Sequence, residues 1–111
     1  WEAANIAANN KLDNIINIVD VNDSAKQLMP IDNLGLKWKA FGWNVLNCDG
    51  HSDISLKNAF DKIKNIKNQK PSVVLAKTTK GKGIPFMEGH GKWHHKIPND
   101  HELKLIRKIL K

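Results

Sequence analysis

The chain has 111 residues, the length of one domain. Hydrophobic residues make up 41% and charged residues 26% of it, a globular composition that excludes disordered and fibrous proteins. No apolar run approaches the roughly 20 residues that cross a bilayer, so we expect no membrane segment. The single Cys48 excludes an internal disulfide framework and a cysteine-based zinc site, and it favours a cytoplasmic protein.

The excess positive charge, +7 in total, comes from the second half of the chain. Residues 1–56 hold four lysines against seven acidic residues, whereas residues 57–111 hold fourteen basic residues against four acidic ones. Only one basic residue is arginine, the residue that base recognition and phosphate binding favour. Aromatic residues make up 6%, which is little for stacking on single strands. A basic nucleic-acid-binding module is therefore an alternative that is disfavoured against a solvated, lysine-rich surface.

Apolar periodicity predicts four helices that alternate with three strands. The helices are expected at residues 1–12, 33–41, 53–66 and 100–110, the last three after caps at Asp32 or Asn33, Ser52 or Asp53, and Asn99 or Asp100. The strands are expected at residues 15–21, 43–48 and 72–77, the first and third with the apolar composition of buried parallel strands. In the last helix, the apolar residues Leu103, Ile106, Ile109 and Leu110 are expected to face the core. The alternation predicts an α/β fold with a parallel sheet flanked by helices.

Ligands of such sheets bind beyond the carboxyl ends of the strands, which favours the loops that follow the first and third strands. Asp20 and Asn22 leave the first strand on one side of the chain. Their carboxylate and amide oxygens suit a hard cation such as Mg²⁺. Ordinary turn formation is the alternative, because Asp and Asn after a strand hydrogen-bond to their own backbone.

The long loop at residues 78–98 begins within the run KTTKGKG, residues 77–83. Glycines let a backbone approach a ligand and lysines supply positive charge, so phosphate is the expected guest. The spacing matches neither a Walker loop nor the dinucleotide fingerprint. Further along, His90, His94 and His95 surround Trp93. Hydrogen bonding to phosphate or sugar oxygens is favoured for these histidines over a transition-metal site, because adjacent histidines of an extended chain point apart.

A series of short blocks resembles the transketolase family. The blocks are WEAA at 1–4, KLDN at 11–14, VDVN at 19–22, KWKAFGW at 37–43, DGH at 49–51, KP at 70–71, KTTKGKG at 77–83, FME at 86–88 and KWH at 92–94. They are most similar to the separate N-terminal subunit of transketolases that are divided into two chains. The resemblance implies a thiamine-diphosphate-binding α/β domain of an enzyme that moves a two-carbon ketol unit from a ketose phosphate to an aldose phosphate.

The same resemblance implies roles for individual residues. Asn22 would give a side-chain oxygen to the divalent metal and touch the diphosphate, and Ser24 would give its backbone carbonyl to the same metal. Lys80 would contact the cofactor. His94 would contact the diphosphate and act as the catalytic histidine near the substrate carbon. Glu2 matches an acidic residue near the subunit interface. The implied cofactors are thiamine diphosphate and Mg²⁺, with Ca²⁺ or Mn²⁺ as alternatives to Mg²⁺.

The resemblance also implies partners and a larger assembly. The partners would be a C-terminal transketolase subunit with the pyrimidine-binding domain, a second copy of this subunit, and sugar phosphates of the pentose phosphate pathway. The family's Gly-Asp-Gly metal motif and the first strand of its sheet stand before the position that matches Trp1. Residues 1–111 are therefore expected to be the C-terminal portion of the diphosphate-binding domain, with an unpaired sheet edge and without activity as an isolated fragment.

Two departures from the family pattern accompany the resemblance. Residues 23–27 differ from the family's common continuation, and His95 stands where a glycine is usual. Another thiamine-diphosphate enzyme, such as a 1-deoxyxylulose-5-phosphate synthase or a 2-oxoacid dehydrogenase subunit, is an alternative; the KWH and FGW blocks favour transketolase.

Overall fold

The computed structural model describes residues 1–27, 29–89 and 91–111. The elements are α1 (Glu2–Asn9), β1 (Ile16–Val21), the 3₁₀ helix η1 (Ser24–Gln27), α2 (Leu34–Ala40), β2 (Asn44–Asp49), α3 (Asp53–Asn65), β3 (Ser72–Lys77), the 3₁₀ helix η2 (Gly91–His94) and α4 (Asp100–Ile109). Every expected helix and strand is present, most with ends within one residue of the expected ones. The two 3₁₀ helices lie in segments expected to be loops.

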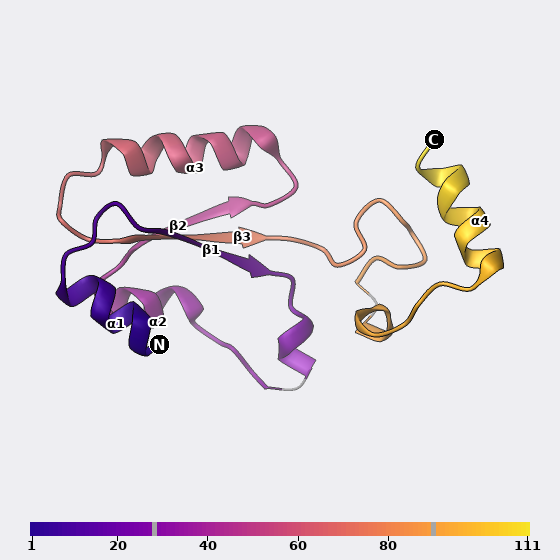
Figure 1. Cartoon of the computed structure of the whole chain (residues 1–111), viewed down its shortest axis with the longest axis horizontal. Coiled ribbons are helices and arrows are strands. Elements are labelled where there is room, and N and C mark those ends of the chain that lie inside the picture. The colour runs from indigo at the N-terminus through magenta and orange to yellow at the C-terminus, as the bar shows by residue number, and fades with distance from the viewer. Residues whose placement is uncertain (28, 90) are drawn as a thin grey trace.

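The three strands form one parallel sheet in the order β1-β3-β2 (Figure 1). β3 pairs with both neighbours, and its last residue, Lys77, lies beside Val21 on one side and Asp49 on the other. The carboxyl ends of all three strands therefore lie level with one another. The α/β class and the parallel, helix-flanked sheet are confirmed.

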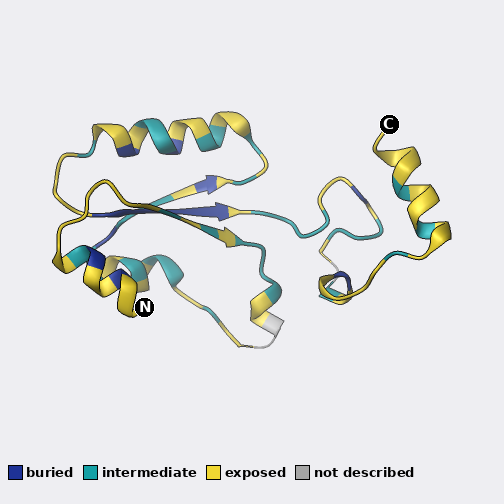
Figure 2. Ribbon diagram, in the orientation of Figure 1, coloured by how far each residue is buried: buried dark blue, intermediate teal, exposed yellow. Residues whose placement is uncertain are grey.

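Helices cover both faces of the sheet, α1 and α2 on one face and α3 on the other (Figure 1). Side chains of a strand alternate between the faces. Val73 and Leu75 of β3 accordingly pack in a cluster with residues of α1, and Val74 and Ala76 pack with residues of α3. β3 is the buried centre of the molecule (Figure 2).

The prediction that β1 is a buried strand is wrong. Ile16 and Ile18 are 41% and 55% exposed, whereas Val19 and Val21 pack against the cluster beneath α1 and α2. The reason is lateral position: α3 packs on β2 and β3, and within the described residues no element covers the same face of β1. The unpaired sheet edge expected from the sequence is present along β1.

The prediction that the apolar stripe of α4 faces the core is also wrong. No residue of this helix is buried, and Leu103, Ile109 and Leu110 are all exposed. The helix lies beyond the carboxyl edge of the sheet, at the end of the long loop (Figures 1 and 2). The core clusters are formed by the sheet with α1, α2 and α3, so the chain brings no further apolar layer against α4.

The structure selects one residue of each expected pair of caps. Ser52 accepts a hydrogen bond from the Ser55 N–H at 3.2 Å, and Asn99 forms a capping box with Glu102. Asn33 precedes α2 with a φ of 55° and makes no side-chain cap bond. Across the three described segments, no helix is both long enough and apolar enough to cross a membrane.

Candidate functional site

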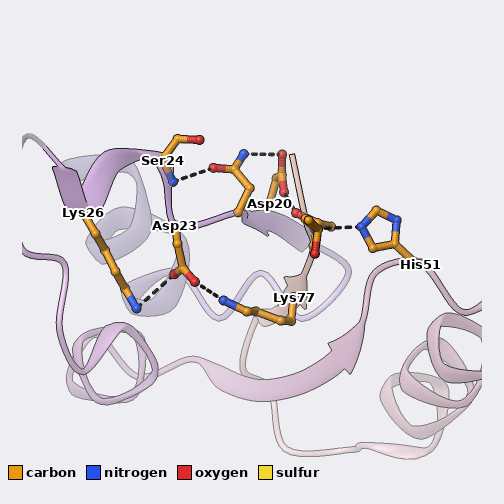
Figure 3. A network of polar contacts seen from close by, with 9 residues as sticks. Asp20, Asp23, Ser24, Lys26, His51 and Lys77 are labelled. Atoms are coloured by element: carbon orange, nitrogen blue, oxygen red, sulfur yellow. Dashed lines mark hydrogen bonds and ion pairs between the residues drawn. The ribbon is translucent and has the colours of Figure 1, made fainter. Parts of the chain in front are cut away.

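The carboxyl ends of the strands bring three turns together, those that follow β1, β2 and β3 (Figure 3). Asp20, the penultimate residue of β1, connects two of them. One carboxylate oxygen accepts a hydrogen bond from the Asn22 side-chain amide at 2.9 Å, and the other accepts from the Thr78 hydroxyl. The expectation that Asp20 and Asn22 share one side of the chain is confirmed.

The Thr78 hydroxyl is the main reason why the pKa of Asp20 lies below its ordinary value. Partial burial opposes this effect, and the Asn22 amide with the charges of Lys80 and His51 adds to it. Asp20 therefore stays ionised at neutral pH, as an oxygen ligand at this edge of the sheet.

Asn22 takes part in a turn as well. Its side-chain oxygen accepts the backbone N–H of Ser24 at 3.0 Å, the pattern of an Asx turn. The turn chemistry that was the alternative at this position is therefore present. It does not exclude ligand binding, because an amide oxygen has two acceptor positions and this bond uses one.

Asp23 forms ion pairs with Lys26, at 2.9 Å, and with Lys77 (Figure 3). Hydrogen bonds from Lys77 and then Lys26 lower the pKa of Asp23, and the pair with Asp23 raises the pKa of Lys26. Lys77, the first lysine of the KTTKGKG run, thus binds a carboxylate of its own chain. This leaves Lys80 and Lys82 as the lysines of the run that a phosphate would meet.

The glycines of the run have a role within the loop itself. Gly81 has a φ of +73°, and a Cβ there would lie 2.7 Å from the backbone oxygen of Met87. The Gly89 N–H donates to the Lys80 carbonyl at 2.9 Å, and the Gly83 N–H donates to the Glu88 carboxylate at 2.9 Å. Residues 80–89 therefore form a closed, hydrogen-bonded loop with Lys80 at its start.

Trp93 anchors the segment that carries the histidines. It is buried, its indole N–H donates to the Phe86 carbonyl at 3.1 Å, and the Lys96 ammonium lies 4.3 Å from its ring centroid. His94 and His95 follow as exposed side chains whose rings meet edge to face, with centroids 4.5 Å apart. His90 lies outside the described residues.

The four predicted site residues lie around two neighbouring pockets. Asn22, Ser24 and Lys80 line a pocket of about 330 Å³, and His94 lines a pocket of about 490 Å³ together with Asn22 and Ser24. The structure therefore brings together residues that are 72 positions apart in the sequence, Asn22 and His94. Glu2 lies on α1, in the helix layer beneath the sheet (Figure 1).

The donors at this edge fit a hard divalent cation in part. Asp20 and Asn22 offer carboxylate and amide oxygens of the kind that Mg²⁺ and Ca²⁺ bind. Over residues 1–27, 29–89 and 91–111, however, no three His, Cys, Asp or Glu side chains lie close enough to hold a metal ion. The oxygens of these residues would form one part of a metal site.

His51, in the turn after β2, was not among the predicted site residues. Its Nε2 accepts the backbone N–H of Thr79 at 2.8 Å, and the side chain lines a pocket with Asp20, Thr79 and Lys80. The DGH block was the sequence signal that could have indicated it.

Known proteins share both the sequence and the fold of this chain. Residues 1–111 match the family described as "Transketolase, thiamine diphosphate binding domain". One of the two subunits of an apulose-4-phosphate transketolase from Actinobacillus succinogenes is 44% identical over 117 aligned positions, which include all of this chain and 41% of that protein. Human transketolase is 36% identical over 98% of this chain and 18% of its own length. The chain thus spans well under half of these relatives.

Solved structures agree. A transketolase from Campylobacter jejuni superposes with a TM-score of 0.73 at 35% identity, over 82% of this chain and 15% of that one. A transketolase from Pichia stipitis superposes with a TM-score of 0.82 at 25% identity, over 96% of this chain and 16% of that one. The likeness covers the sheet and its helices as well as the sequence blocks.

Proposed function

Since the chain belongs to the transketolase family, as a thiamine-diphosphate-binding domain, we propose that it is part of an enzyme which transfers a two-carbon ketol unit from a ketose phosphate to an aldose phosphate. The observation that carries the proposal is the meeting of Asn22, Ser24, Lys80 and His94 around two adjoining pockets at the carboxyl edge of the sheet. Cofactors of α/β proteins bind at this edge.

Each of these residues has a chemistry suited to a metal diphosphate. Asn22 would give its side-chain oxygen, and Ser24 its backbone carbonyl, to Mg²⁺ or, in its place, Ca²⁺ or Mn²⁺. Lys80 would neutralise charge on the diphosphate. Thiamine diphosphate itself supplies the carbanion chemistry, and the protein orients it.

His94 would act at the boundary between cofactor and substrate. It is an exposed imidazole whose segment is anchored by the buried Trp93. We assign it hydrogen bonding to the diphosphate and proton handling near the substrate carbon, as the catalytic residue of this chain. His95 lines the same pocket, at the position where a glycine is usual in the family.

The partners belong to the same proposal. Two relatives of similar sequence are named as one subunit of an apulose-4-phosphate transketolase, and another is named as one subunit of a 6-deoxy-6-sulfo-D-fructose transketolase from a Clostridium species. Such names imply a partner chain. We propose a C-terminal subunit with the pyrimidine-binding domain and a second copy of this subunit, with sugar phosphates of the pentose phosphate pathway as substrates.

The proposal includes the division of the domain. Residues 1–111 would be the C-terminal portion of the diphosphate-binding domain, and the 111-residue chain alone would bind no thiamine diphosphate tightly. The lone Cys48, which is buried, favours the reducing cytoplasm as the compartment.

The test is a transfer assay with the full-length protein and its partner subunit. Ketose phosphates and aldose phosphates are supplied with thiamine diphosphate and Mg²⁺, and the two-carbon transfer products are identified by mass spectrometry. We expect His94→Ala to lower kcat by about 10²-fold or more. His101→Ala, at an exposed histidine of α4, is the matched control and should leave kcat unchanged. Absence of transfer with every substrate pair would refute the proposed function.

A further inference from the structure

The turn between β2 and α3 lies directly against the end of β3. The Gly50 N–H donates to the Lys77 carbonyl at 2.7 Å. A Cβ at Gly50 would lie 2.5 Å from the Thr78 methyl carbon and 3.1 Å from the Lys77 carbonyl oxygen. The close approach of two backbones, and not a positive φ, therefore requires glycine at this position.

This approach places His51 beside the first residues of the long loop (Figure 3). The His51 backbone N–H donates to the Asp49 carboxylate at 2.9 Å, which orders the turn. The His51 side chain then accepts the Thr79 N–H through Nε2, at 2.8 Å. An imidazole that accepts at Nε2 carries its proton on Nδ1 and is neutral.

The beginning of the loop is thus held from both neighbouring strands. From the β1 side, Asp20 accepts the Thr78 hydroxyl, and from the β2 side, His51 accepts the Thr79 N–H. The next residue is Lys80, which shares a pocket with His51 and Asp20. Because the Thr79 amide is already used, the group left to meet an anion at this point is the Lys80 side chain.

We propose that His51 is a positioning residue, which fixes Thr79 and thereby directs the Lys80 ammonium toward the diphosphate of the cofactor. The inference rests on the proposed function, since it requires an anionic ligand at Lys80. The hydrogen bond to Thr79 is exposed to solvent, so its loss leaves the core of β3 intact. The effect of removing it is confined to the order of the loop and the affinity for the anion.

Two substitutions at position 51 separate positioning from simple packing. The amide oxygen of Gln reaches the place of Nε2, and the shorter Asn side chain reaches only the place of Nδ1. In the full-length protein with its partner subunit, we expect His51→Asn to raise the Kd for thiamine diphosphate by roughly tenfold, the value of one hydrogen bond. His51→Gln should keep the wild-type Kd. Isothermal calorimetry measures the Kd, and kcat at saturating cofactor should be equal in all three proteins.

Hydrogen exchange gives a reading that needs no cofactor. The amides of residues 78–82 should exchange faster in His51→Asn than in His51→Gln, while those of β3 and the thermal midpoint stay unchanged. Equal affinity in the wild type and His51→Asn, or equal losses in both variants, overturns the inference. If the wild-type complex binds no thiamine diphosphate, the proposed function fails. The exchange rates then decide whether His51 orders the loop: equal rates in the two variants overturn that as well.

Discussion

In the sheet region, residues 1–77, the strand β3 is almost inaccessible to solvent, whereas among the described residues of the loop region, 78–111, only Ile84 and Trp93 are buried. The sheet region is stabilised by apolar side chains on both faces of β3. The loop region is ordered by local contacts, such as the Gly89 to Lys80 backbone bond and the Asn99 cap.

The difference shows how this molecule divides its tasks. A tightly packed sheet fixes the ends of three strands, and the residues that would meet a ligand stand on turns and loops attached to those ends. Changes in the sheet region should therefore affect the whole fold, and changes in the loop region should have local effects. Three sets of substitutions and one pH titration measure that contrast.

The largest effect is expected at the centre of the sheet. Val74→Ala should lower the free energy of unfolding of the 111-residue chain by about 2–3 kcal/mol, because truncation of a fully buried side chain leaves a cavity. Leu110→Ala is the control: it follows α4, is 69% exposed, and should cost less than about 0.5 kcal/mol. Urea unfolding measures both. Equal costs would show that α4 shares the core.

A smaller loss is expected where the sheet region meets the loop region. Gly50→Ala should cost about 1–3 kcal/mol, because the added Cβ overlaps with Thr78 at the end of β3. Gly35→Ala is the matched control, since a Cβ in α2 would meet Leu75 and Val45 at an ordinary 3.6 Å. It should raise stability by up to about 1 kcal/mol through helix propensity. A neutral Gly50→Ala would contradict the close approach.

The α4 cap should contribute locally. Asn99→Ala removes a capping box and should destabilise α4 by about 1 kcal/mol. Hydrogen exchange should quicken at the amides of α4 while those of β3 keep their protection. Faster exchange in β3 would mean that α4 and the sheet unfold together, contrary to the separation of the two regions.

The smallest effect is a pH dependence of the same helix. The Lys96 ammonium and then the Asn99 N–H hold the pKa of Glu102 below its ordinary value of 4.5. A depressed pKa stabilises the folded state above the unfolded pKa, and this contribution is lost as pH falls through the folded pKa. The order of α4 should therefore decline below about pH 4.5. An NMR titration measures this, and Lys96→Gln should move the midpoint upward; an unmoved midpoint would exclude the ion pair as the cause.

Local sequence was sufficient for the elements of the fold. Helix periods, β-branched runs and the caps at Ser52 and Asn99 depend on neighbours within a few residues. The exposure of β1 and α4 could not be predicted in this way, because it depends on which elements cover them. The strand order β1-β3-β2, which makes β1 an edge, is a property of the whole chain.

The candidate site shows the same boundary between local and distant information. Strand ends and the KTTKGKG run led to Asn22 and Lys80 without a structure. The ion pair of Lys77 with Asp23 and the bond of His51 to Thr79 join residues 54 and 28 positions apart. No period or local motif reports such a pair. It becomes visible only once β3 lies between β1 and β2.

The level ends of the three strands have a consequence for the fidelity of folding. Asp20 and Cys48 both pair with Ala76, so the register that buries β3 is also the one that sets Thr78 beside Asp20 and Thr79 beside His51. A slip of β3 by one residue would turn Val74 and Ala76 to the opposite face and separate these polar pairs in the same step. A mispaired chain would therefore lose its core and its ligand-binding edge together, so that no stable but defective form of this edge is available to it.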